Sequence, residues 1–208
     1  MLPVLVAATL LSGIYADVDG DGHADAVSLT RHAQSFTVRV DIGTRVVTKV
    51  VRGFSGRKPA AEGLPRIAAF RSINNRRGFE IIVRVWRGAA NDFLIVYALG
   101  HGQLVALTGG PHDPSSPPFV WDVGGTVGTG TSNADCIARG RIGVLDEWTY
   151  RGIWHYRMTT YDARPTRLVK QQVYELASEA MLRELPRDWP KLKHLDFGSC
   201  GGFRLPGQ

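Results

Sequence analysis

The sequence predicts a mainly β fold: a small antiparallel barrel or sandwich, or a partial set of propeller-like hairpins, with one C-terminal helix. Two observations lead to this fold class. Short runs alternate between apolar and polar residues, as in residues 36–42, which is the pattern of a half-buried strand. The 24 Gly and 11 Pro residues suit numerous turns between short strands, and the 44% hydrophobic content is enough for a core.

The strands are expected mostly in pairs. Residues 36–42 and 46–51 should form a hairpin, because the intervening Gly43, Thr44 and Arg45 give the usual hairpin spacing. Residues 81–86 and 93–99 make a second pair. Further strands are predicted at residues 103–107, 137–145, 147–150 and 154–161. The Gly- and Thr-rich stretch 124–130 is predicted to be irregular.

One helix is predicted at residues 173–185, where Pro186 ends it. Residues 14–208 are expected to form a single β-rich domain. Residues 1–13 are nearly all apolar but lack a basic start, so they are either a signal-peptide remnant or a first strand. They are too short to span a bilayer, and no transmembrane span is expected elsewhere.

The charge is basic, with a formal net charge of +6 and a pI near 9.6. Single arginines stand between apolar residues, as Arg39 and Arg84 do, which is typical of the solvent faces of half-buried strands. The short clusters at 71–77 and 183–193 are too mixed for a nucleic-acid footprint, so no nucleic-acid partner is expected. Contact with an anionic polymer stays open as a minority interpretation.

An acidic motif, DxDxDGxxD, predicts a calcium site at residues 17–25. It places four carboxylates at motif positions 1, 3, 5 and 9: Asp17, Asp19, Asp21 and Asp25. Calcium takes six to eight hard oxygen ligands, and alternating aspartates on a tight loop turn their carboxylates toward one centre. Gly22 permits the sharp turn, and the carbonyl of His23 is expected to be a further ligand. The alternative is an acidic turn that binds nothing specific.

The surroundings of the motif distinguish it from an EF-hand. Position 12 is Ser28, not glutamate, and the following residues 26–30 have the composition of a strand, so the loop is predicted to join strands. Residues 72–80 resemble a decayed second copy of the loop, 55 positions later. In this copy Arg76 replaces the third aspartate, and its guanidinium is a candidate to occupy the place of the metal.

Residues 16–29 resemble the FG-GAP/VCBS-type calcium repeat of integrin-like propellers and many secreted bacterial proteins. The wider pattern is similar to a group of extracytoplasmic actinobacterial proteins, through the 81–88 strand, the Gly124-Gly125 pair before Cys136, and the terminal Cys200-Gly-Gly. This resemblance implies a structural Ca²⁺, extracellular placement, and a binding or adhesion role. Only one and a half repeats are recognisable, so a full propeller is not expected.

The chain has two cysteines, Cys136 and Cys200, in no Cys-x-x-Cys arrangement. One structural disulfide is predicted, and two buried free thiols are the alternative. The disulfide is favoured because the calcium loop also indicates a place outside the cytoplasm.

No motif of an enzyme is present, and the leading hypothesis is therefore a non-enzymatic calcium-binding module, secreted or at the cell envelope. Its partner would be a cell-wall polymer or another protein. Two alternatives stay open: a secreted hydrolase that uses His112 and Asp113 in the Pro-rich loop, and a polyanion-binding module in which calcium is only structural. Among the tryptophans, Trp86 and Trp154 are expected in the core, and Trp121 is left open.

Overall fold

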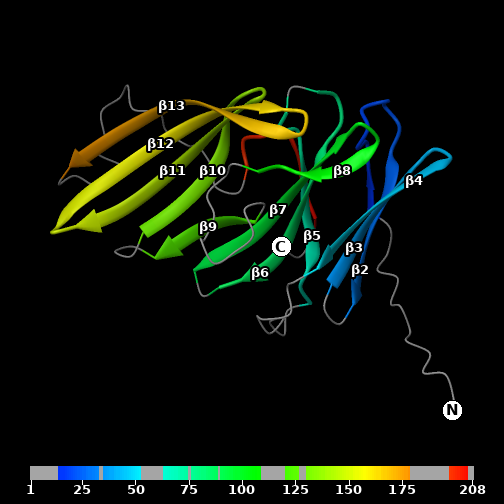
Figure 1. Cartoon of the computed structure of the whole chain (residues 1–208), viewed down its shortest axis with the longest axis horizontal. Helices are drawn as coiled ribbons and strands as arrows, with labels where there is room; N and C mark the ends of the chain where they lie inside the picture. Colours follow the sequence, from blue (N-terminus) through cyan, green and yellow to red (C-terminus); the bar gives the residue numbers. More distant parts are fainter. Residues whose placement is uncertain are drawn as a thin grey trace, which may run out of the picture.

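A computed structural model describes residues 14–32, 35–52, 63–74, 76–88, 90–108, 120–126, 130–178 and 197–205. These residues form two antiparallel sheets (Figure 1). The prediction of a mainly β fold is thus confirmed. The predictions for residues 1–13, a signal remnant or a first strand, lie outside the described residues.

The first sheet has four strands in the order of the chain. Its members are β1 (Ile14–Ala16), β2 (Asp25–His32), β3 (Ser35–Ile42) and β4 (Arg45–Arg52). The hairpin predicted at residues 36–51 is confirmed as β3 and β4, with Ile42 paired to Arg45 across the turn. In β2 and β3 every second residue is buried over most of the strand, which gives this sheet one apolar face and one solvent face.

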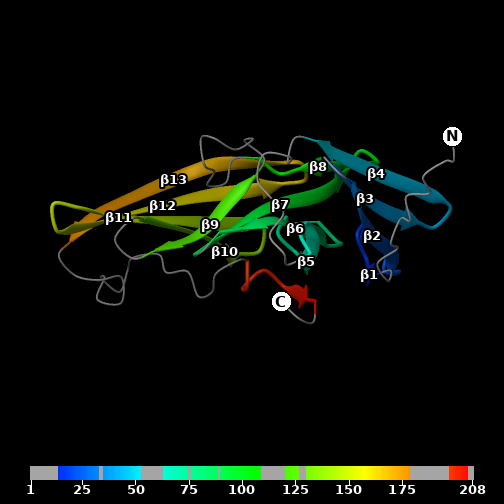
Figure 2. The same cartoon turned by 90° about the horizontal axis from the view of Figure 1, so that it is seen from below.

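The second sheet has ten strands and a long, twisted outline (Figure 2). Its strand order is β13-β12-β11-β10-β9-β7-β6-β5-β14, and β8 pairs with β7. The bounds are β5 (Arg66–Arg71), β6 (Glu80–Arg87), β7 (Asn91–Gly100), β8 (Gln103–Ala106), β9 (Trp121–Thr126), β10 (Gly130–Ala138), β11 (Arg141–Tyr150), β12 (Ile153–Arg164), β13 (Arg167–Ser178) and β14 (Gly202–Arg204). The strands predicted at residues 81–86, 93–99, 103–107 and 154–161 are confirmed.

The predicted C-terminal helix is wrong where the structure describes it. Residues 173–178 belong to β13, which pairs with β12 along most of its twelve residues. Tyr174 and Leu176, two positions apart, pack on the buried group around Met158, so the period of two decides the local structure over the helix-forming composition. Residues 179–185 lie outside the described residues.

Two smaller predictions also need correction. The strand predicted at residues 137–145 is divided by a turn at Arg139 and Gly140, where Gly140 has a φ of 68°. Residues 124–126, predicted to be irregular, continue β9, and Gly124 has a φ of 101° close to the backbone of Ala90. A single glycine in a left-handed conformation is compatible with a strand that bends, so glycine content alone was misleading.

The core has two main parts, on opposite faces of β5–β7. One face carries Phe70, Val83 and Ile95 and packs against the apolar face of the first sheet, as in a sandwich. The other face carries Leu94 and Val96 and packs with residues of β9–β12 inside the curve of the second sheet. The apolar residues of the first sheet and of β5–β7 thus share one core. The described strands do not close into a barrel.

A C-terminal segment, residues 197–204, joins two strands that are not neighbours in the second sheet. It bonds to β10 through Phe197 N–H and the Ala134 carbonyl (2.9 Å), and it ends in β14 beside β5. The predicted disulfide between Cys136 and Cys200 is confirmed, with an S–S length of 2.03 Å. The bond covalently links β10 to this segment and rules out two free thiols.

Candidate metal centre

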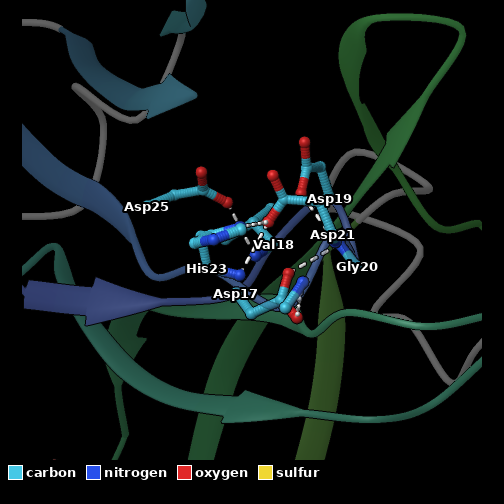
Figure 3. Close-up of polar contacts among 8 residues, drawn as sticks. Asp17, Val18, Asp19, Gly20, Asp21, His23 and Asp25 are labelled. Carbon is cyan, nitrogen blue, oxygen red and sulfur yellow. Dashed lines mark hydrogen bonds and ion pairs between the residues drawn. The ribbon is translucent and has the colours of Figure 1, made fainter. Parts of the chain in front are cut away.

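The loop predicted to bind calcium, residues 17–25, connects β1 to β2 and is named the calcium loop after that prediction. Figure 3 shows the polar contacts of its side chains. Ala16 pairs with Asp25 at the start of the hairpin, so the intervening residues must turn within a short span. Gly20 and Gly22 make this possible because their φ angles, 82° and 92°, lie where other residues are strained. The prediction that this loop joins strands, and is not an EF-hand, is confirmed.

Three aspartates of the loop face one another. Asp17, Asp19 and Asp21 each offer a carboxylate oxygen, and these oxygens lie within 4.8 Å of one another. Asp17 is half-buried and Asp21 is exposed. The three aspartates therefore lie at the protein surface, with Asp17 more buried than Asp21. The spacing of two residues in the motif therefore produces the convergence that the sequence predicts.

Backbone amides of the loop hold these carboxylates in place. Gly20 N–H donates to Oδ1 of Asp17 at 2.6 Å, and Gly22 N–H donates to its Oδ2 at 3.1 Å. Asp21 N–H donates to Asp19 Oδ1 at 3.0 Å. These bonds fix the direction of the carboxylates without neutralising their charge.

His23 contacts the loop through its backbone and its ring. Its N–H donates to Asp21 Oδ1 at 2.7 Å, and this bond is the main reason why the pKa of Asp21 lies below its ordinary value. The ring is exposed and its Nδ1 lies 3.3 Å from the same oxygen. The role predicted for the His23 carbonyl stays a prediction.

Asp25 lies apart from the other three aspartates. It is buried, and its Oδ2 accepts a hydrogen bond from Val18 N–H at 2.9 Å. Burial raises the pKa of Asp25, and the charges of Asp19 and Asp21 raise it further. The fourth carboxylate thus interacts electrostatically with the group, although its oxygens are not among the three that converge.

The donor set fits a hard divalent cation. The converging atoms of Asp17, Asp19 and Asp21 are carboxylate oxygens, which can act as metal ligands. The hydrogen bonds that these carboxylates accept come from backbone amides, and the His23 ring lies beside Asp21. Calcium prefers carboxylate and carbonyl oxygens and tolerates irregular geometry, whereas softer metals favour sulfur or imidazole nitrogen. Three carboxylates at this separation also repel one another, and a cation would relieve that repulsion.

The second loop, residues 72–80, repeats two hydrogen bonds of the first at an offset of 55 residues. Ile73 N–H donates to Glu80 Oε2 at 2.6 Å, as Val18 N–H donates to Asp25. Arg76 N–H donates to Asn74 Oδ1 at 2.8 Å, as Asp21 N–H donates to Asp19. The internal repeat is therefore present in the structure, and β2 and β6 correspond residue for residue at the same offset.

Arg76 corresponds to Asp21 at the offset of 55 residues, and both side chains are exposed. The buried group of the second loop is Glu80, which accepts hydrogen bonds from Ile73 N–H and Asn74 N–H. The hypothesis that the Arg76 guanidinium occupies the place of a metal stays a prediction.

The two loops lie against each other, a contact that the sequence did not indicate. Phe79 N–H donates to the Asp17 carbonyl at 2.8 Å. Gly78, with a φ of 93°, has no room for a side chain, because an added Cβ would lie 2.7 Å from the Val18 carbonyl oxygen. No local pattern could have revealed this contact, since it depends on how the two sheets pack.

The other candidate residues are not brought to this site. His112 and Asp113 lie outside the described residues, so the hydrolase hypothesis stays untested. Trp121, left open from the sequence, is in the core, where its Nε1–H donates to the Leu107 carbonyl at 3.0 Å. Trp86 and Trp154, expected in the core, are partly buried and pack against it.

Comparisons with protein-family models, curated proteins and solved structures found no match to this chain. Within the part of the chain that the structure describes, no helix has the length and apolar character needed to cross a membrane.

Proposed function

We propose that this chain is a non-enzymatic calcium-binding module that works outside the cytoplasm and has a binding or adhesion role at the cell envelope. Calcium is structural in this proposal and is held by Asp17, Asp19 and Asp21, with Asp25 and the His23 carbonyl as further ligands. The observation that carries the proposal is the convergence of three carboxylates within 4.8 Å on a strand-joining loop. The resemblance of residues 16–29 to FG-GAP/VCBS-type repeats supports the same conclusion.

The position of the loop supports a structural role for the ion. The loop connects two paired strands of the first sheet and contacts Phe79, which directly precedes β6 of the second sheet. An ion bound there would stabilise the hairpin and the contact between the sheets, because binding to the folded state alone adds to the free energy of unfolding. At a free calcium concentration of 100 times Kd this contribution is about 2.7 kcal/mol.

Placement outside the cytoplasm is supported by the disulfide between Cys136 and Cys200. Disulfides persist mainly in oxidising compartments, and millimolar calcium is typical of the same compartments. The net charge of +6 suits an anionic envelope polymer as partner, and a protein partner fits the binding role equally.

Thermal unfolding with calcium and with EDTA, under non-reducing conditions, tests the metal site. We expect a melting temperature that rises and saturates with calcium, while Asp17→Ala and Asp21→Ala melt like the EDTA-treated wild type in both conditions. Asp41→Ala is the matched control, because Asp41 is an exposed carboxylate of the same sheet whose partner is Arg39. This variant should keep the full calcium response. Equal melting temperatures of wild type and both loop variants in excess calcium would contradict the proposal.

Binding to the envelope is tested by co-sedimentation with purified cell-wall material. Retention that weakens between low and high salt indicates ionic contact with the polymer, since screening reduces surface attraction. Absence of retention at low salt, with calcium present, would contradict a polymer partner and leave protein partners.

A further inference from the structure

We infer that the second loop, residues 72–80, is a metal-independent positioning element that shapes the calcium loop. The inference rests on the calcium site proposed above and goes beyond it, because none of the residues concerned would touch the ion. It assigns a role to a segment that, from the sequence, is only a decayed copy of the motif.

The second loop has a hydrogen bond between two side chains at a place where the equivalent side chains of the first loop are both acceptors. Side-chain Nδ2 of Asn74 donates to Oε1 of Glu80, while Ile73 N–H and Asn74 N–H donate to Oε2 at 2.6 and 3.3 Å. The equivalent residues of the first loop are Asp19 and Asp25. Two carboxylates cannot bond to each other without a proton or a cation, whereas an amide and a carboxylate can. The second loop therefore keeps its shape without a metal.

The second loop is also fixed to the rest of the fold on both sides. At its start, Ser72 N–H donates to the Gly201 carbonyl at 2.8 Å, beside the disulfide-linked C-terminal segment. At its end, the ring of Phe79 meets the ring of Phe203 edge to face, with centroids 6.0 Å apart, and Glu80 begins β6. These contacts do not involve the calcium loop, so they persist whether or not an ion is bound there.

The two loops meet backbone to backbone with no space between them. A Cβ on Gly78 would lie 2.7 Å from the Val18 carbonyl oxygen and 2.9 Å from the Gly20 nitrogen. In the other direction, a Cβ on Gly20 would lie 2.6 Å from the Arg77 backbone. Together with the bond from Phe79 to the Asp17 carbonyl, this contact sets the path of residues 17–20, which carry the first two carboxylates.

A preformed loop loses less conformational entropy on binding than a loose one, and so binds more tightly. Repulsion among the carboxylates of Asp17, Asp19 and Asp21 favours a more open calcium loop when no cation is bound. The second loop opposes this by holding the backbone of residues 17–20 in the conformation that brings Asp17 and Asp19 together. The calcium affinity of the first loop should therefore depend on residues of the second.

The test compares Gly78→Ala with Gly152→Ala by calorimetric titration of the full chain with calcium. Both glycines have positive φ, 93° and 79°, so both alanine variants carry the same kind of backbone strain. A Cβ on Gly152, in the β11–β12 turn, meets nothing within 4 Å, whereas a Cβ on Gly78 meets the calcium loop. We expect calcium affinity to fall at least tenfold in Gly78→Ala and to stay within twofold of wild type in Gly152→Ala.

The outcomes separate this inference from the proposed function. Wild type that binds no calcium removes the metal site, and with it the inference. Wild type that binds calcium, together with a Gly78→Ala variant of equal affinity, overturns the positioning role and leaves the site. If circular dichroism shows that Gly78→Ala does not fold, Asn74→Ala takes its place, since it opens the second loop without adding atoms. An unchanged affinity in that variant also overturns the inference.

Discussion

Glu80 is a carboxylate in the interior of the protein, and replacing it with glutamine should change how stability depends on pH. The side chain is 4% exposed, and its oxygens accept three hydrogen bonds from the second loop. Burial disfavours the ionised form, whereas the three donors favour it. Burial is the larger effect, and it raises the pKa of Glu80 from 4.5 to about 7.

The sign and size of the effect follow from this pKa. Below pH 4.5 Glu80 is protonated in both the folded and the unfolded state, so its contribution to stability is fully present. As pH rises from 4.5 toward 7, the unfolded chain releases its proton while the folded protein retains it, and the free energy of unfolding falls. At about 1.4 kcal/mol per pH unit, the total loss is about 3 kcal/mol, complete a little above pH 7.

Urea unfolding of wild type and Glu80→Gln between pH 5 and pH 8.5, followed by tryptophan fluorescence in EDTA, measures this loss. We expect the wild type to lose about 2–3 kcal/mol more than the variant across this range, because glutamine does not titrate. The glutamine variant should be less stable at pH 5, since its NH2 group takes the place of one of the two oxygens that accept hydrogen bonds from Ile73 and Asn74. Parallel pH profiles of the two proteins would refute the reasoning.

Two further changes have defined expected outcomes. Replacing both Cys136 and Cys200 with alanine opens a cross-link between residues 64 apart, which should lower the free energy of unfolding by about 4 kcal/mol in urea; an unchanged midpoint would contradict a stabilising disulfide. Asp25→Ala leaves the buried Val18 N–H without its carboxylate, so it should cost about 1–3 kcal/mol even in EDTA; a calcium-free stability equal to wild type would show that this bond contributes nothing.

Local patterns predicted most of the strands. In β3 the apolar residues stand at every second position, and the turn at Gly43 and Thr44 follows directly, so strand, turn and register are all contained in a few neighbouring residues. The same reasoning was wrong for β13. There the composition favours a helix, and only the pairing with β12, a partner elsewhere in the chain, makes the period of two decisive.

For the candidate metal centre, too, the sequence predicted some features and not others. The convergence of Asp17, Asp19 and Asp21 was predictable, because alternating residues on a tight turn point toward one centre. The separate place of Asp25 was not, since it depends on the burial of that side chain beneath Val18. The contact of Gly78 with the calcium loop was also not predictable from the sequence, because it joins residues about 60 positions apart through the packing of two sheets.

The placement of β14 bears on how the chain folds during synthesis. Strand β5 pairs with β6 on one side and with Gly202–Arg204 on the other, so its second edge is filled by residues made more than 130 positions later. Until those residues leave the ribosome, the unpaired backbone groups of β5 form an open edge, which is a template for pairing with other chains. During the interval between synthesis of β5 and of β14, this edge is therefore available for pairing with other chains.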